Sequence, residues 1–228
     1  MKAYYTSGTV GDAYIILCKV YSVAKKEKIL CRHYTKYESL RPIIKDIYSL
    51  IPSIGVEFIN ERSSDVELIG AFHYQGKERE KNRYNLEPEY YPEFELGNIN
   101  HFNLPKSYVT LQIKSGTHGE NSQSLSMDII KKILDDSKLP VVIIGEKTID
   151  LPPGNFSMLD LRGNTTIKEV INIIKNSKHY YGLPGFLSFV AVSHKIMSDV
   201  HITFPKHINA MKARTEAVKE WREFLIKR

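Results

Sequence analysis

The regular alternation of short β-type runs with segments of helical periodicity constrains this fold more than any other feature. In the first half, Lys2–Thr6, Lys28–Arg32 and Val56–Ile59 are short runs rich in apolar residues and are predicted as strands. Between them, Ala13–Lys25 and Glu38–Leu50 carry apolar residues at helical spacing. Strands that alternate with helices form right-handed βαβ units, in which the strands are parallel. We therefore expect an α/β protein built on parallel sheets.

The same alternation resumes after Pro105 and runs toward the end of the chain. The predicted strands are Tyr108–Ile113, Pro140–Gly145, Met158–Leu161, His179–Gly182 and Val200–Phe204. The predicted helices are Ser126–Leu134, Ile167–Asn176, Phe186–His194 and a final amphipathic helix over Asn209–Lys227. Thr166 and Glu169 have the spacing of a capping box, which marks the start of the helix that follows them.

Between the two halves the alternation weakens. Asp65–Phe72 allows one more strand, and Lys77–Glu95 is crowded with charges, tyrosines and prolines. The latter stretch is either a solvated connection or an acceptor-binding loop, since long loops in small domains often carry function. We expect two Rossmann-like domains, residues 1–102 and 103–228, with open, mainly parallel sheets that face a cleft; the final helix could cross back to the first.

Composition narrows the class of protein further. The chain has 228 residues and only two cysteines, Cys18 and Cys31, which we interpret as buried small hydrophobes. No Cys and His cluster has the spacing of a metal site, and no apolar stretch reaches the length of a membrane span. The N-terminal run lacks a small-residue cleavage site, so we expect a cytoplasmic protein without a signal peptide.

The net charge of +6 favours anionic partners. These include nucleotides, phosphorylated sugars and the surface of an anionic membrane, with which the protein could make peripheral contact. The basic residues are spread along the chain and no nucleic-acid-binding motif accompanies them. Nucleic acid is therefore not expected as the main partner.

Ligands of open parallel sheets bind at the carboxyl ends of strands, so the turns that follow strands are the candidate sites. The first is Ser7-Gly8-Thr9-Val10-Gly11-Asp12. Gly8 and Gly11 would let the backbone approach a ligand, and the helix start would present N–H groups to an anion. Asp12 falls in the first helical turn, where a carboxylate is also favoured by the helix dipole alone.

Three further turns follow strands in the second half. Lys114-Ser115-Gly116-Thr117-His118-Gly119 offers a lysine, hydroxyls and glycines to a phosphate, or is a connecting loop. Gly163-Asn164-Thr165-Thr166 is foremost a turn and helix cap. Gly182-Leu183-Pro184-Gly185-Phe186-Leu187-Ser188 places a glycine turn before a helix, where backbone amides could receive a diphosphate, or is a tight structural turn.

Together these turns resemble the heptosyltransferase-type glycosyltransferases of the two-Rossmann GT-B architecture. That family opens with a GxxGD turn, matched by Gly8 through Asp12, and has a phosphate loop resembled by Lys114–Thr117. A buried strand ending in glycine with a nearby acid follows, as in PVVIIG before Glu146. Leu161 through Glu169 is similar to its next segment.

The fourth turn departs from the family. Where the family usually carries Asp-Ser-Gly and then a histidine, this chain has Leu183-Pro184-Gly185 and Ser188. The chain is also shorter than the family's usual length. The match is strongest over residues 106–204.

The resemblance implies an inverting, metal-independent transfer of a hexosyl- or heptosyl-type sugar. The donor would be a nucleotide-diphospho-sugar, a co-substrate rather than a cofactor, and the acceptor a carbohydrate or glycolipid hydroxyl. The first domain would take the acceptor and the second the donor, with Asp12 as the general base. The residues expected to bind donor or phosphate are Gly8, Gly11, Lys114, Ser115, Gly116, Thr117, Glu146, Gly163, Thr165, Pro184, Gly185 and Ser188.

Two other functions fit the same residues. The lost acid, hydroxyl and imidazole of the fourth turn favour a non-catalytic protein that binds a nucleotide or sugar. A sugar-nucleotide epimerase or hydrolase on the same architecture is the third hypothesis. Turnover separates the first hypothesis from the second, and the need for an acceptor separates it from the third.

Overall fold

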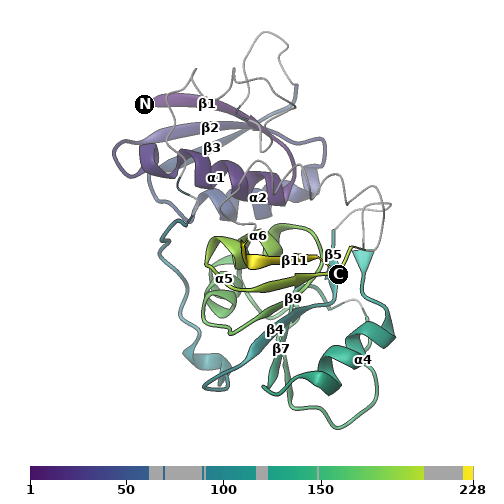
Figure 1. Cartoon of the computed structure of the whole chain (residues 1–228). Helices are drawn as coiled ribbons and strands as arrows, with labels where there is room; N and C mark the ends of the chain where they lie inside the picture. Colours follow the sequence, from purple (N-terminus) through teal and green to yellow (C-terminus); the bar gives the residue numbers. More distant parts are fainter. Residues whose placement is uncertain are drawn as a thin grey trace. The chain divides into compact units, whose positions relative to one another are not determined.

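The computed structural model describes residues 1–61, 69, 89, 91–116, 123–147, 149–202 and 223–227. They form two compact units, the first ending at Glu95 and the second beginning at Leu96. Figure 1 shows the parallel sheet of each unit. The chain is thus an α/β protein with mainly parallel, Rossmann-like sheets, as the alternation predicts. The assignment of an acceptor side and a donor side to residues 1–102 and 103–228 stays a prediction.

The sheet of the first unit follows the predicted βαβ course. Its parallel strands are β1 (Lys2–Ser7), β2 (Ile29–Tyr34) and β3 (Ile54–Ile59), in that order across the sheet. The connections are α1 (Val10–Ala24), and then the 3-10 turn η1 (Glu38–Leu40) with α2 (Arg41–Tyr48).

Strand β1 has a pairing partner on each of its two edges. Thr6 pairs with His33 of β2 on one edge, and forms a parallel bridge with Ile69, which lies in the predicted strand Asp65–Phe72. The Ile69 N–H donates to the carbonyl of Tyr5 at 2.7 Å. A residue can pair with two strands only through opposite edges, so Ile69 lies on the side of β1 away from β2.

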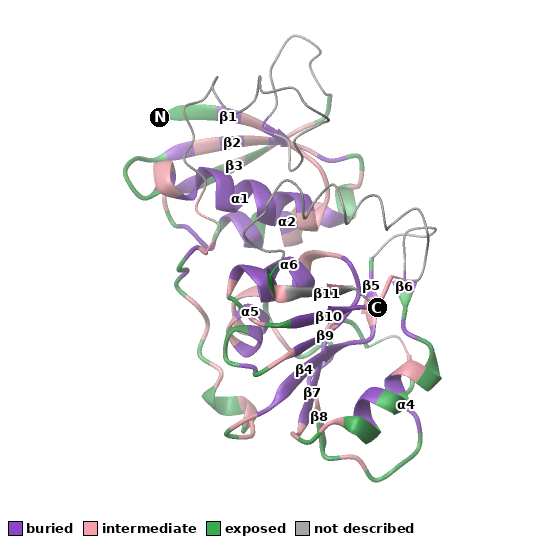
Figure 2. Cartoon of the chain, viewed as in Figure 1, coloured by how far each residue is buried: buried purple, intermediate pink, exposed green. Residues whose placement is uncertain are grey.

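Helix α1 is buried almost all round, as the purple ribbon in Figure 2 shows. One covering segment is the end of the predicted acceptor loop Lys77–Glu95, most of which lies outside the described residues. The Tyr21 hydroxyl donates to the carbonyl of Glu93 at 2.6 Å. Phe94 is buried and meets the rings of Tyr14 and Tyr21 edge-on. The described part of this loop is therefore packed structure rather than a solvated connection.

The second unit holds a six-stranded parallel sheet. Its strands in chain order are β4 (Val109–Gln112), β7 (Val141–Ile144), β8 (Met158–Asp160), β9 (Tyr180–Gly182), β10 (Ser198–Val200) and β11 (Leu225–Lys227). Across the sheet they lie in the order β11-β10-β9-β4-β7-β8. Counted from β4, this is the Rossmann order 3-2-1-4-5-6. The order reverses between β4 and β9, which are hydrogen-bonded neighbours.

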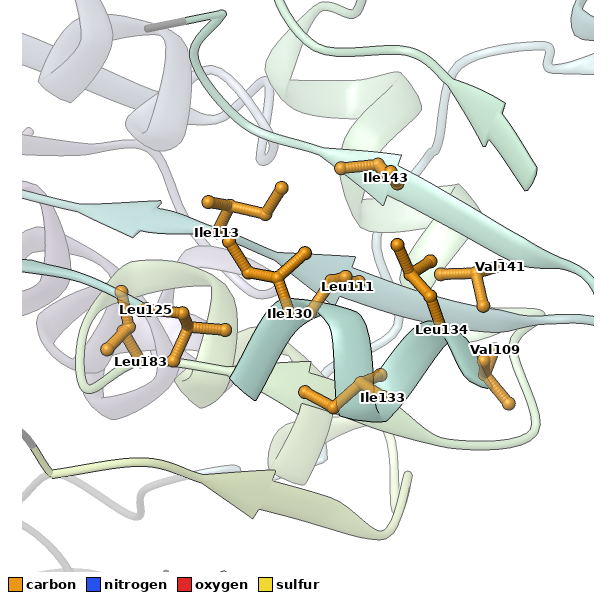
Figure 3. Packing of buried hydrophobic residues seen from close by; sticks show 10 residues of the cluster. All are labelled: Val109, Leu111, Ile113, Leu125, Ile130, Ile133, Leu134, Val141, Ile143 and Leu183. Atoms are coloured by element: carbon orange, nitrogen blue, oxygen red, sulfur yellow. The ribbon is translucent and has the colours of Figure 1, made fainter. Parts of the chain in front are cut away.

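Helices cover both faces of this sheet. Helix α4 (Met127–Asp136) packs Ile130, Ile133 and Leu134 against alternate residues of β4 and β7, the apolar cluster in Figure 3. Right-handed crossovers then require α5 (Ile167–Lys175) and α6 (Phe186–Ser193) to lie on the opposite face, as Figure 1 shows.

Most predicted helices and strands of the second half are confirmed within one or two residues. The capping box of α5 is confirmed as well, because the Thr166 N–H donates to Glu169 Oε2 at 2.7 Å and the Glu169 N–H to Thr166 Oγ1 at 3.3 Å. No helix among the described residues combines the length and apolarity needed to cross a membrane.

The end of the chain corrects two predictions. The strand expected over Val200–Phe204 is found at Ser198–Val200 instead. The final helix was predicted over Asn209–Lys227; its residues up to 222 lie outside the described part of the chain, and Leu225–Lys227 forms strand β11, paired in parallel with Ser198–Val200. The pairing partner is distant in sequence, so a helical periodicity cannot reveal it. A second missed pairing is the short antiparallel ladder of β5 (Lys114–Ser115) and β6 (Gln123–Ser124).

Candidate functional site

The reversal between β4 and β9 brings the second and fourth predicted turns together. The Ser115 hydroxyl, three residues beyond β4, donates to the carbonyl of Pro184 at 2.8 Å. Both residues are buried. Because β4 and β9 are parallel neighbours, both turns lie at the carboxyl edge of the sheet, where ligands of this fold bind. This edge, lined by Lys114, Ser115, Glu146 and Gly185, is the candidate site.

Gly185 is required by its backbone and by its neighbour. Its φ is +155°, and a Cβ placed on it would lie 2.6 Å from Ser115 Oγ. Gly185 is the N-cap of α6, and its N–H donates to Ser188 Oγ at 3.1 Å. The Ser188 hydroxyl donates in turn to the carbonyl of Gly185 at 2.8 Å.

Both predicted phosphate-binding serines therefore already use their single proton. A hydroxyl has one O–H donor, and those of Ser115 and Ser188 go to backbone carbonyls of the turn. The donors that the turn can offer to an anion are backbone N–H groups at the start of α6, which have no acceptor within the helix. The serines therefore hold the turn in its conformation, and the groups that could bind an anion are the backbone N–H groups and Lys114.

Lys114 and Glu146 extend from neighbouring strands at this edge. Gln112 of β4 pairs with Ile144 of β7, so the residues beyond them lie side by side. Lys114 Nζ is 3.6 Å from Glu146 Oε2, with side chains 23% and 50% exposed. Gly145, at φ +103°, makes the turn that leads to Glu146. A cation and an anion, both accessible to solvent, thus lie side by side next to the reversal of the strand order between β4 and β9.

Two residues that the sequence did not single out fix this turn. The Tyr180 hydroxyl donates to the side-chain carbonyl of Gln112, and the Gln112 amide donates to the carbonyl of Lys114 at 2.8 Å. Burial raises the pKa of Tyr180 well above its usual value, so the hydroxyl stays protonated. The signal was available, because Gln112 is a polar residue inside the apolar strand YVTLQI.

The third predicted turn, Gly163-Asn164-Thr165-Thr166, lies beside the end of β7. The Gly163 N–H donates to the carbonyl of Gly145 at 2.8 Å, and Gly163 has a φ of +74°. Thr165 is half-buried and precedes the N-cap Thr166. The hydrogen bonds of this turn match the structural interpretation, a turn and helix cap, and donor binding by Gly163 and Thr165 stays a prediction. Gly116 is exposed with a φ of +85°, and Thr117 lies outside the described residues.

The first predicted turn lies in the other unit, at the end of β1. Gly8 has a φ of +134°, and a Cβ there would lie 2.6 Å from Asp12 Oδ2. Asp12 is 7% exposed, and its Oδ2 accepts the Thr9 N–H at 2.8 Å and the Thr9 hydroxyl at 3.0 Å. Gly11 is a half-buried residue inside α1. Asp12 therefore caps its own helix. This is the structural role that the sequence left open beside the role of a general base.

A buried polar network supports this first turn. His33 of β2 places Nε2 3.3 Å from the Gly8 carbonyl, and its Nδ1 lies 2.9 Å from Thr6 Oγ1 and 3.1 Å from the Tyr48 hydroxyl. Burial lowers the pKa of His33 to about 4. In the neutral ring with its proton on Nε2, Nε2–H donates to the Gly8 carbonyl and Nδ1 accepts from a neighbouring hydroxyl. His33 was not predicted as a functional residue, although a histidine within the strand sequence ILCRHY departs from its otherwise apolar inward-facing pattern.

The arrangement at the second unit suits an anionic ligand with a polar neighbour. Lys114 and the α6 start offer positive potential, and Glu146 offers a hydrogen-bond acceptor. Within the described ranges, no three His, Cys, Asp or Glu side chains are grouped as a metal site would require. The two cysteines are buried, and desolvation raises the pKa of Cys31 to about 12.

Comparison with known proteins gives a distant likeness only. No family model and no curated protein matches the chain. Solved structures that match include the bacterial iron-containing dodecameric glycosyltransferase TibC from enterotoxigenic E. coli H10407, at 14% identity and a TM-score of 0.47 over 87% of this chain. Another is the dodecameric iron-containing heptosyltransferase TibC in complex with ADP-D-β-D-heptose, at 14% identity and a TM-score of 0.44 over 86% of this chain.

The chain spans 57% of the length of each of these two structures. With TM-scores below 0.5, they transfer neither residues nor activity to this chain. The fold stated above rests on this chain's own strand order.

The contact between Gly185 and Ser115 predicts a rescue. Gly185→Ala should lower the free energy of unfolding by about 1–3 kcal/mol, because the new Cβ meets Ser115 Oγ and the backbone is strained. Adding Ser115→Ala should recover part of that loss. Gly163→Ala is the matched control: it carries only the backbone strain, since its Cβ would have 3.8 Å of clearance. Additive losses for the Gly185 and Ser115 substitutions, measured by urea unfolding, would contradict the contact.

The neutral state of His33 predicts acid sensitivity. The folded pKa of about 4 lies below the ordinary unfolded value of about 6.5, so the unfolded chain binds more protons between these values. Stability should therefore fall as the pH drops, by about 2 kcal/mol between about pH 7 and 5 from this one group. His33→Gln should reduce that slope relative to the wild type in urea titrations. Equal slopes would show that His33 titrates freely in the folded protein.

Proposed function

We propose that the chain binds a nucleotide-diphospho-sugar at the carboxyl edge of the second unit's sheet and transfers the sugar to an acceptor hydroxyl. One observation carries the proposal: the Ser115–Pro184 hydrogen bond holds the turns after β4 and β9 together at the reversal of a Rossmann strand order. Such a reversal is where nucleotides bind in this architecture. The resemblance to heptosyltransferase-type glycosyltransferases supports the choice of reaction.

On the donor side, the proposed binding groups are charged side chains and backbone N–H groups. Lys114 and the N–H groups at the start of α6 would receive the diphosphate and stabilise the charge that grows on it as the sugar departs. Glu146, at the end of β7, would accept hydrogen bonds from the ribose hydroxyls. Ser115, Pro184, Gly185 and Ser188 would hold the turn in shape, which the hydrogen bonds among them support.

On the acceptor side, Asp12 would be the general base. Its Oδ2 caps α1, but a carboxylate has further lone pairs, so the cap leaves it able to accept a proton. In the proposed step, the acceptor oxygen forms a bond to the anomeric carbon while the bond to the diphosphate breaks. The hydroxyl proton passes to Asp12, and the anomeric configuration inverts. The proposed reaction needs no metal, and the acceptor class is a carbohydrate or glycolipid.

A non-catalytic nucleotide or sugar binder is the second candidate. The observation that favours it is the use of Ser188 and Asp12 in helix caps, together with the Leu183-Pro184-Gly185 sequence of the fourth turn. These contacts would persist in a protein that holds a nucleotide without turning it over.

Asp12→Asn separates the two candidates. We expect transfer to fall by about 10²–10⁴-fold, since an amide cannot accept the proton, while donor affinity is kept. Stability should fall by about 0.3–1 kcal/mol through the lost helix-dipole interaction. Asp128→Asn is the matched control, because Asp128 also lies in a first helical turn, that of α4, and has no role in the proposed step. Transfer is measured with a panel of nucleotide sugars and sugar acceptors.

The outcomes are distinct. Full transfer by Asp12→Asn would remove Asp12 as the base. Calorimetric binding of nucleoside diphosphates without transfer by the wild-type protein would establish the binder. Absence of binding to any nucleotide or sugar would overturn both candidates.

A further inference from the structure

The ion pair at the carboxyl edge has a property that the proposed donor site does not require. Lys114 Nζ, the cation assigned to the diphosphate, lies 3.6 Å from Glu146 Oε2. The side-chain amide of Gln112 donates to the carbonyl of Lys114 and so fixes the Lys114 backbone. The short distance between Lys114 and Glu146 is therefore not the result of a loosely held loop. Any anion that binds Lys114 must displace or tolerate the Glu146 carboxylate.

A bare polyanion gains little from such a site. Phosphate or pyrophosphate would share Lys114 with a carboxylate, and the like charges would repel. It has no hydroxyl donor to satisfy Glu146. A nucleoside diphosphate differs, because its ribose carries two neighbouring hydroxyl groups that can donate to one carboxylate, as in nucleotide sites of this fold.

We propose that Lys114 and Glu146 exchange partners when ligand binds, so that Glu146 acts as a selectivity residue against anions that lack a ribose diol. In the ion pair Glu146 neutralises Lys114. In the occupied site Lys114 turns to the diphosphate and Glu146 to the ribose hydroxyls. This inference rests on the proposed function, and it adds the discrimination among the phosphate compounds that compete for the same lysine.

The exchange predicts effects of opposite sign from one substitution. Glu146→Gln should tighten binding of inorganic pyrophosphate by about two- to fivefold, the range of an exposed ion pair. The same substitution should weaken binding of ADP, GDP or UDP by about three- to tenfold, because an amide is a poorer acceptor for the diol than a carboxylate. A Glu146 side chain that only balances surface charge would tighten both classes of ligand.

Calorimetry on the full chain tests this with three proteins. The wild type, Glu146→Gln and the control Asp135→Asn are titrated with pyrophosphate, with ADP, GDP and UDP, and with the 2′-deoxy forms of these nucleotides. Asp135 is also an exposed carboxylate in an ion pair of the second unit, with Lys131 on α4, and its variant should match the wild type. Preference for the ribo over the 2′-deoxy nucleotide should be about tenfold in the wild type and largely lost in Glu146→Gln.

Two failures can be told apart. If the wild type binds nucleoside diphosphates but Glu146→Gln leaves pyrophosphate affinity and the 2′-deoxy preference unchanged, the exchange is wrong and the proposed donor site stands. If the wild type binds pyrophosphate and no nucleoside diphosphate, the proposed function fails and the exchange fails with it.

Discussion

The pairing of β4 with β9 is the constraint on which the second unit depends. The paired residues of these strands, such as Thr110 and Tyr180, lie far apart in the sequence, yet the strands are parallel neighbours at the centre of the sheet. Each strand continues into a turn at the same edge, and Ser115 ties one turn to the other through Pro184. The left-handed φ of Gly185 and the glycine itself follow from that close approach. Without the Ser115–Pro184 hydrogen bond, Lys114 and the start of α6 would not be held in a fixed position relative to each other.

The polar groups near this edge divide by what they contact. Buried hydroxyls and amides, from Ser115, Ser188, Gln112 and Tyr180, bond to backbone or to each other and build the turn. The charged groups Lys114 and Glu146 remain accessible. Buried polar groups must be satisfied within the protein, whereas exposed charges can exchange partners at little cost. This division is why we assign shape to the serines and binding to the charged pair.

Sequence periodicity predicted most of the fold because parallel strands and their crossover helices leave local patterns. The capping box at Thr166 is local in the same sense, and it is present. Strand β11 was missed, since its partner Ser198–Val200 lies outside any local window. Glycine turns indicated where a site would lie. The use of Ser115 and Ser188 within the turn could not be predicted, because it depends on which carbonyl lies nearby in three dimensions.

Nuclear magnetic resonance of the full chain, titrated with a nucleoside diphosphate that binds it, tests the central claim most directly. The claim is that nucleotide binds at the carboxyl edge of the second sheet, between the turns after β4 and β9. Amide shifts should therefore change at Lys114–Gly116, Glu146 and Gly185–Leu187. Amides at the opposite edge, such as Tyr108 and His179, should stay unchanged. Shifts concentrated at that opposite edge, or none at the carboxyl edge at saturating nucleotide, would contradict the account.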